Sequence, residues 1–324
     1  MLAIRAARPG GPEVLEPFEA PTPTPGPGQL LVRHDAIGVN FMDTYQRAGG
    51  GVVPVQFPAV LGQEAAGFVE AIGDSVSAFL PGDRVAYLGK SGAYAEYGLA
   101  YAPMAIRLPA AVSFEAAAAG FVKGMTAEFL LRRCYPLKAG ETILVHSAAG
   151  GVGAILVQWA KALGARVIGG VGAPEKSSLA RRLGCDDVIL YSQEDVGARV
   201  REITAGRGVD VAYDSVGQQT FDGTLASLAK RGLFVSYGHS SGPIAPFAPV
   251  RLLQGGSLFF TRPMLFDYIG TRGELEESAE ALFTMIVEDK LKIEIGQTFK
   301  LALASQAHEA LEARKTVGST ILVP

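Results

Sequence analysis

The sequence is poor in cysteine, histidine and tryptophan: its 324 residues include two, four and one of them, respectively. Cys134 and Cys185 are too few for the disulfide framework of a secreted domain, so we expect a reducing, cytoplasmic compartment. The formal net charge is only −3, which leaves no surplus of cations for a nucleic-acid backbone or a membrane surface. Any anionic ligand must therefore be met by a local site.

Long apolar runs are also missing, and none reaches the roughly 20 residues that a membrane-spanning helix needs. The least charged stretch, residues 233–250, is interrupted by glycine, serine and proline. Residues 1–11 lack the apolar segment of a signal peptide, so we expect neither a membrane span nor a secretory leader. The length predicts two domains, each with its own core.

The first third of the chain has the pattern of short strands bounded by glycine or proline, which predicts a compact, mostly β domain. The predicted strands are 29–37, 64–72, 83–88 and 93–99.

From about Phe114, strands alternate with helices such as 153–163 and 176–183, which is the pattern of a doubly wound parallel sheet, the Rossmann fold. A helix at 273–288 and a strand at 319–323 predict a return to the first domain. The predicted fold class is therefore α/β, a Rossmann sheet plus a mostly β domain. The six strands predicted for the sheet are 142–145, 166–171, 187–190, 209–214, 233–237 and 257–261.

A glycine turn, Val-His-Ser-Ala-Ala-Gly-Gly-Val-Gly at 145–153, joins an apolar strand to a helix. Gly150 and Gly151 let the backbone approach a pyrophosphate, and Gly153 lets the helix pack closely on the strand. The helix N-terminus adds free N–H donors and a favourable dipole. Ala148 stands where the dinucleotide fingerprint usually has its first glycine, so a purely structural turn is the alternative.

The next predicted strand ends in Ile168-Gly169-Gly170-Val171-Gly172, without the acidic side chain that binds the ribose hydroxyls of NAD. A 2′-phosphate would not be repelled there. Lys176, four residues past Gly172, is placed to donate a charge-assisted hydrogen bond to that phosphate. The sequence therefore favours NADPH, with a solvated helix lysine as the alternative interpretation of Lys176.

Further motifs follow one another along the whole chain at 10–15, 36–45, 61–67, 81–85, 123–127, 213–217 and 261–263. With the glycine turn, they resemble the zinc-independent medium-chain dehydrogenases/reductases of the NADPH:quinone oxidoreductase family, which is related to zeta-crystallin. The resemblance implies a GroES-like catalytic domain, 1–120 and 265–324, split around an NADPH-binding Rossmann domain, 121–264, with the cofactor in the cleft between them.

The resemblance also implies site residues. Asn40 and Tyr45 would lie beside the nicotinamide, and Thr126 would help to hold it. Two of the positions named next have an alternative interpretation: Tyr191 could cap the third strand, and Arg314 could be a helix-end cation. The remaining positions implied at the cofactor are Gly151 and Val152 at the pyrophosphate, Lys176, Tyr191 and Arg314 around the adenosine phosphate and neighbouring phosphates, and Gly238, His239, Ser240, Ser241 and Arg262 along the far wall. Gly172 and Ser215 are further candidate cofactor-binding positions.

A catalytic zinc needs about three nitrogen, sulfur or carboxylate ligands. Zinc-dependent relatives carry a histidine where Gln63 stands, a cysteine where Asn40 stands, and four closely spaced cysteines for a second zinc. Neither set is present, so we expect no metal site. The four histidines, His34, His146, His239 and His308, are scattered along the chain.

Without a metal, the substrate must already accept hydride readily, and quinones do because their reduction gains aromaticity. We expect an open, partly apolar slot lined by Asn40, Tyr45 and Gln63, whose amide and phenol donors bond the quinone oxygens as charge develops. Asp43 and Glu64 are candidates for a proton relay, and a buried carboxylate that orders a loop is the alternative for each.

Two other functions remain open: reduction of a carbon–carbon double bond conjugated to a carbonyl, and a non-enzymatic NADPH-binding or RNA-binding role like that of a crystallin. The negative net charge weighs against nucleic acid. For assembly, the resemblance suggests a homodimer formed through the strand 257–261. Exposed Leu258, Phe259 and Phe260 would suit such an edge, although an internal strand has the same pattern.

Overall fold

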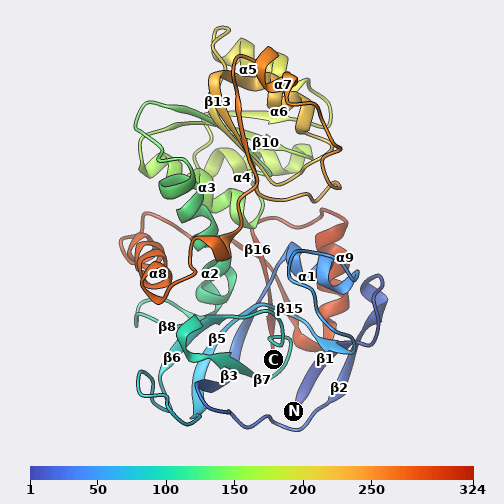
Figure 1. The fold of residues 1–324 in the computed structure, drawn as a ribbon, viewed down its shortest axis with the longest axis vertical. Coiled ribbons are helices and arrows are strands. Elements are labelled where there is room, and N and C mark those ends of the chain that lie inside the picture. The colour runs from blue at the N-terminus through green and yellow to red at the C-terminus, as the bar shows by residue number, and fades with distance from the viewer. The chain divides into compact units, whose positions relative to one another are not determined.

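The computed structural model describes all 324 residues, which fold as two compact units (Figure 1). Unit 1 comprises Met1–Met125, Thr271–Glu288 and Ile293–Pro324, and unit 2 comprises Thr126–Gly270 and Asp289–Lys292. Helix α2 (Phe114–Phe129) contains the residues at which unit 1 passes into unit 2. None of the helices is long and apolar enough to span a membrane.

Unit 1 is built on two β-sheets. A seven-stranded sheet has the order β15-β16-β3-β5-β6-β8, with β7 also paired to β3, and a three-stranded sheet has the order β2-β1-β4. The strands are β1 (Leu2–Ala6), β2 (Leu15–Glu19), β3 (Gln29–Val39), β4 (Ala59–Val60), β5 (Glu64–Ile72), β6 (Arg84–Leu88), β7 (Tyr97–Tyr101), β8 (Ala105–Arg107), β15 (Ile295–Lys300) and β16 (Ser319–Val323). Its helices besides α2 are α1 (Phe41–Arg47), α8 (Arg272–Val287) and α9 (Ala304–Glu312).

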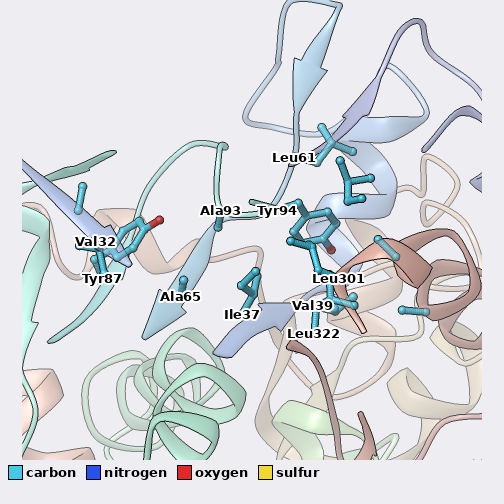
Figure 2. Packing of buried hydrophobic residues seen from close by; sticks show 14 of the residues in the cluster. Val32, Ile37, Val39, Leu61, Ala65, Tyr87, Ala93, Tyr94, Leu301 and Leu322 are labelled. Carbon is cyan, nitrogen blue, oxygen red and sulfur yellow. The ribbon is translucent and has the colours of Figure 1, made fainter. Parts of the chain in front are cut away.

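The core of unit 1 joins the beginning of the chain to its end. Ile37 and Val39 of β3 belong to the same buried cluster as Leu301 and Leu322 (Figure 2). The strand predicted at 319–323 is β16, which pairs antiparallel with β3. Burial of apolar side chains from both ends of the sequence therefore holds α1 and the start of β5 on a rigid support.

The strand predicted at 93–99 is wrong in its first half. Gly92, at a φ of 103°, begins a turn in which Tyr94 donates its backbone N–H to Leu61, and β7 begins only at Tyr97. The segment has the pattern of a strand because a glycine precedes it and most of its side chains are apolar or aromatic. Tyr94 is fully buried in the core instead (Figure 2).

Unit 2 contains a six-stranded sheet in which every pairing is parallel, with the order β11-β10-β9-β12-β13-β14. This is the doubly wound order of dinucleotide-binding folds, and it confirms the predicted fold class. The strands are β9 (Thr142–His146), β10 (Arg166–Val171), β11 (Asp187–Leu190), β12 (Val209–Asp214), β13 (Leu228–Ser236) and β14 (Phe259–Thr261). The helices are α3 (Gly151–Ala162), α4 (Ser177–Arg182), α5 (Val196–Ile203), α6 (Phe221–Ser227) and α7 (Val250–Gln254).

Two strand boundaries differ from the prediction because of local backbone geometry. The strand predicted at 233–237 begins at Leu228, and its pairing with β12 shifts register near Arg231, which has a φ of 63°. The strand predicted at 257–261 begins at Phe259, because Ser257 adopts a φ of 58°.

The expectation that three neighbouring apolar side chains on the last strand are exposed is correct for one of them. Phe259 is 61% exposed, whereas Leu258 is 6% exposed and Phe260 packs against the rings of Phe234 and Phe247. Alternate residues of a strand point to opposite faces, so Phe259 faces away from this ring cluster.

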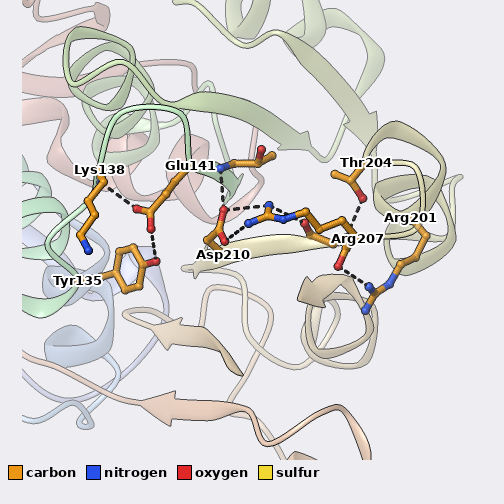
Figure 3. A network of polar contacts seen from close by, with 9 residues as sticks. Tyr135, Lys138, Glu141, Arg201, Thr204, Arg207 and Asp210 are labelled. Carbon is orange, nitrogen blue, oxygen red and sulfur yellow. Dashed lines mark hydrogen bonds and ion pairs between the residues drawn. The ribbon is translucent and has the colours of Figure 1, made fainter. Parts of the chain in front are cut away.

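A polar network ties the amino ends of β9 and β12 together (Figure 3). Asp210 accepts a hydrogen bond from the backbone N–H of Thr142 at 2.9 Å and pairs with Arg207, while Glu141 accepts one from the Tyr135 hydroxyl at 3.0 Å. Parallel α/β sheets bind ligands at the carboxyl ends of their strands. This network lies at the amino ends of the strands, so we assign it a structural role: it holds the segments that precede β9 and β12.

Candidate functional site

The glycine turn has the backbone geometry of an anion-binding site. Ser147 adopts a φ of 53°, and Gly150 precedes α3 without any side-chain cap on the helix N-terminus. A Cβ at position 153 would lie only 2.1 Å from the carbonyl oxygen of Ser147, so only glycine fits there. The N–H groups of Gly151 and Val152 in the first turn of α3 are thus left for a ligand, as a phosphate requires.

Three glycines at the end of β10 each make room for a neighbouring side chain. A Cβ would lie 2.5 Å from Sγ of Cys185 at Gly169, 2.6 Å from Nδ1 of His146 at Gly170, and 2.7 Å from the hydroxyl oxygen of Tyr191 at Gly172. The end of β10 therefore lacks the acidic side chain of an NAD site for a steric reason as well. The space that a side chain at position 172 would enter is occupied by the Tyr191 phenol.

Lys176 lies in a different element from the one predicted, since it does not begin the helix expected at 176–183. It closes a one-turn 3₁₀ helix, Pro174–Lys176, and α4 begins only at Ser177. Its side chain is partly buried.

The predicted far wall forms one cluster at the carboxyl ends of β12, β13 and β14. Ser240 donates its backbone N–H to Ser215 at 3.1 Å, and Arg262 donates to His239 at 3.2 Å. A Cβ at Gly238 would lie 2.8 Å from the carbonyl oxygen of Ser215. Partial burial, and then the Arg262 guanidinium, lower the pKa of His239, which therefore stays neutral near pH 7. Ser241 closes the same loop by donating its hydroxyl and its backbone N–H to the carbonyl of Val216.

In unit 1, Asn40 and Gln63 lie at the same end of the β3–β5 pair. Gly38 pairs with Glu64 in the sheet register, and the Asn40 amide donates to Glu64 at 2.8 Å. Gln63 is 5% exposed, and its side-chain nitrogen has no hydrogen-bond partner in the chain. A buried amide donor without a partner is costly, so this atom is suited to a ligand oxygen.

The other predicted residues are placed more simply. Tyr45 lies on α1, partly buried, with its ring 6.3 Å from that of Phe41. Thr126 is partly buried within α2. Arg314 lies just beyond α9, exposed, at a φ of 56°.

Glu64 is the buried acceptor that organises this end of unit 1. It is fully buried and accepts hydrogen bonds from the Asn40 amide, from the backbone N–H of Val122 at 2.7 Å and from the Lys123 ammonium at 3.2 Å. All of its partners are donors, which favours the loop-ordering role over a proton relay.

Asp43 stands at the end of a directed chain of hydrogen bonds. Its carboxylate accepts from the Asn40 backbone N–H at 2.8 Å and from the Tyr94 hydroxyl at 3.0 Å. Tyr94 is 2.9 Å from Nε2 of His308, whose Nδ1 is 3.0 Å from the Arg47 guanidinium. Burial is the main cause that raises the pKa of Asp43 to about 7.

The chain behind Asp43 ends at a group that does not release a proton. Because Arg47 donates to Nδ1 of His308, Nε2 of that ring carries the proton and donates to Tyr94. Each donor therefore points inward toward Asp43, and the guanidinium keeps its proton throughout the usual pH range. This arrangement favours Asp43 as a residue that orders the start of α1.

Lys123, a partner of Glu64, did not emerge from the sequence as a site residue. A signal was present, since it is the one cation in an otherwise apolar, alanine-rich stretch of α2 and is 6% exposed. A buried lysine needs a carboxylate, but nothing local indicates which one. The four histidines lie apart, and the structure contains no group of three His, Cys, Asp or Glu side chains that could hold a metal ion.

Comparison with known proteins agrees with this geometry. The chain matches the models of the alcohol dehydrogenase GroES-like domain over residues 26–110 and of the zinc-binding dehydrogenases over residues 151–283. It is 48% identical to the quinone oxidoreductase of Pseudomonas aeruginosa over 99% of both chains, and 43% identical to the 2-haloacrylate reductase of a Burkholderia species over 97% of this chain and 96% of that protein. The Escherichia coli quinone oxidoreductase, solved in complex with NADPH, superimposes with a TM-score of 0.97 at 45% identity and full coverage of both chains.

These matches confirm the predicted resemblance. The chain belongs to the quinone oxidoreductase family of the medium-chain dehydrogenases/reductases.

Proposed function

We propose that this protein is an NADPH-dependent, zinc-independent quinone reductase. The observation that carries the proposal is the match, over nearly the whole chain, to relatives named quinone oxidoreductases, one of which was solved with NADPH. We also propose that it works in the cytoplasm, where its two free cysteines would stay reduced.

NADPH fits the residues of unit 2. The first-turn N–H groups of Gly151 and Val152 would bind the pyrophosphate, and Lys176 with Tyr191, above Gly172, would bind the adenosine 2′-phosphate. When bound, NADPH supplies the hydride. The remaining residues assigned to the cofactor are Asn40, Tyr45, Thr126, Ser215, Gly238, His239, Ser240, Ser241, Arg262 and Arg314.

Asn40, Tyr45 and Gln63 would act on the acceptor. The unpartnered side-chain nitrogen of Gln63 and the Asn40 amide, held by Glu64, are donors for quinone oxygens on which negative charge develops. These residues position and polarise the substrate without a metal, because asparagine and glutamine are poor zinc ligands.

Replacing Lys176 with alanine is expected to weaken NADPH binding about ten- to hundredfold and to leave NADH binding nearly unchanged. A charge-assisted hydrogen bond is worth about 1.5–3 kcal/mol, and each 1.4 kcal/mol is about tenfold in affinity. Fluorescence or calorimetric titration with both nucleotides measures the effect. Lys138→Ala removes an exposed lysine at the amino end of the sheet and should change neither affinity. An equal loss for both nucleotides would refute the role of Lys176.

A second candidate reaction is reduction of an activated carbon–carbon double bond, which the 43% identity to a 2-haloacrylate reductase favours. It needs the same hydride donor and the same amide donors toward a carbonyl. Turnover numbers measured for a benzoquinone series and an enone series separate the two reactions. A clear preference for enones would replace the quinone assignment.

We further propose a homodimer that forms through the edge strand β14. Phe259 on β14 is 61% exposed, and Leu253 of the adjacent α7 is 67% exposed. An unpaired edge with exposed apolar side chains is suited to pairing with a second sheet.

Light scattering is expected to give a mass near twice 33.9 kDa for the native chain and near 33.9 kDa for Phe259→Lys. The charge would be buried without a partner at the edge, which strongly disfavours association. Leu80→Lys is the control, because Leu80 is 62% exposed in unit 1 and its replacement should leave the dimer intact. A native mass near 33.9 kDa would contradict the proposed assembly.

A further inference from the structure

His146 is a fully buried histidine at the end of β9 and the second residue of the glycine turn at 145–153. Its Nε2 lies 2.7 Å from the hydroxyl of Thr224, and that hydroxyl lies 3.0 Å from the buried carboxylate of Asp214. Asp214 in turn accepts the backbone N–H groups of Val216 and Gly217. The imidazole is thus anchored to the loop that follows β12.

The state of the ring follows from its partners. The Thr224 hydroxyl has one proton, for which the Asp214 carboxylate and the Thr220 carbonyl at 2.7 Å are acceptors, so Nε2 of His146 is the donor. Burial lowers the pKa of His146 and keeps the ring neutral. Nδ1 has no hydrogen-bond partner and faces Gly170, where a Cβ would lie 2.6 Å away.

The other neighbour of this ring is Tyr191. The two ring centroids are 5.6 Å apart at an interplanar angle of 69°, an edge-to-face contact. At the far end of the same phenol, the hydroxyl oxygen lies 2.7 Å from the position that a Cβ of Gly172 would take. His146 therefore supports one end of a side chain whose other end covers the end of β10.

We propose that His146 is a positioning residue for cofactor selectivity: it holds the Tyr191 phenol at the place where an NAD-dependent enzyme carries its acidic side chain. This inference rests on the proposed NADPH function. The acidic side chain of an NAD site accepts hydrogen bonds from the ribose hydroxyls and repels a 2′-phosphate. A phenol, in contrast, can donate a hydrogen bond to the 2′-phosphate. The anchored imidazole supplies the support that keeps the phenol there.

Two substitutions separate the ring of His146 from its hydrogen bond. His146→Gln keeps a donor toward Thr224 and loses the ring, and it is expected to weaken NADPH binding about three- to tenfold, the size of an aromatic pair contact, with NADH within twofold. His146→Phe keeps the ring and loses the donor, and it should retain the NADPH preference at a lower melting temperature. Both affinities are measured by titration of the purified chain.

A double variant tests whether the effect passes through Tyr191. Tyr191→Leu should reduce the NADPH preference, and adding His146→Gln should reduce it no further, because the supported side chain is already gone. His34→Gln is the matched control. His34 is buried beside the ring of Tyr87 at 5.7 Å in unit 1, so its loss lowers stability without changing the ratio of the two affinities.

The results distinguish this inference from the function on which it rests. If the native chain prefers NADPH and His146→Gln leaves the preference intact, or if the two substitutions are additive, the positioning role is wrong and the proposed cofactor stands. If the native chain has no affinity for NADPH, both are wrong.

Discussion

Replacing Glu64 with alanine is expected to lower the free energy of unfolding of unit 1 by about 3–5 kcal/mol, the cost of breaking a buried ion pair by removing one partner. The Lys123 ammonium would stay 6% exposed without its carboxylate, which lies 3.2 Å away in the native chain. The Asn40 amide and the backbone N–H of Val122 would lose their acceptor as well. Urea denaturation, monitored by far-UV circular dichroism, measures this loss of stability.

The double variant Glu64→Ala/Lys123→Met removes both charges and fills the space with an apolar side chain. It should be more stable than Glu64→Ala alone, because no uncompensated cation remains in the interior. If the single and double variants unfold at the same urea concentration, the destabilisation does not come from Lys123, and the carboxylate acts mainly through Asn40 and Val122.

The parts of the structure that the sequence predicts well are those in which the signal is local. The strands predicted at 166–171, 187–190 and 209–214 are β10, β11 and β12, since each is a short apolar run bounded by turn residues. The glycine turn is local in the same way. Gly153 is required by a carbonyl oxygen only six residues earlier, so a nine-residue motif contains the whole constraint.

The polar contacts around the candidate site are not local, and the sequence does not reveal them. Asn40 meets Glu64 across 24 residues, Glu64 meets Lys123 across 59, and Tyr94 meets His308 across 214. No periodicity connects such positions, because the fold alone brings them together. His146 lies within the most informative motif of the chain, yet its partners come from distant segments: Thr224 lies on α6, and Tyr191 directly follows β11.

Acidification from pH 6.5 to pH 4 is expected to reduce the free energy of unfolding by at least about 3 kcal/mol, because buried histidines resist protonation in the folded chain. Burial lowers the pKa of His34 from 6.5 to about 4, and burial followed by the Arg47 guanidinium lowers that of His308 to about 3. Both groups titrate near 6.5 when the chain is unfolded. Their contribution is therefore fully present above pH 6.5 and is lost as the pH falls.

Asp43 opposes this trend. Its pKa is raised by burial from 3.8 to about 7, so the folded chain binds a proton that the unfolded chain has released, and its contribution to stability is lost as the pH rises through 7. Among these three groups, acidification from pH 6.5 to pH 4 adds two protons to the unfolded chain at His34 and His308, while the folded chain already holds one more at Asp43. Their net difference of one proton corresponds to about 1.4 kcal/mol per pH unit, and buried His146, whose pKa burial also lowers, adds to this loss.

Replacing a buried histidine and replacing Asp43 should change the slope of the free energy of unfolding against pH in opposite directions. Asp43→Asn removes the opposing proton and should steepen the loss by about 1.4 kcal/mol per pH unit relative to the native chain, whereas His34→Gln should reduce it by about the same amount. Urea midpoints at pH 7, 5.5 and 4.5 measure all three chains. A native chain whose stability does not change over this range, or a His34→Gln variant with the native slope, would show that these buried groups titrate as they do in water. The burial of His34, His308 and Asp43 would then have to be far looser than the hydrogen bonds around them indicate.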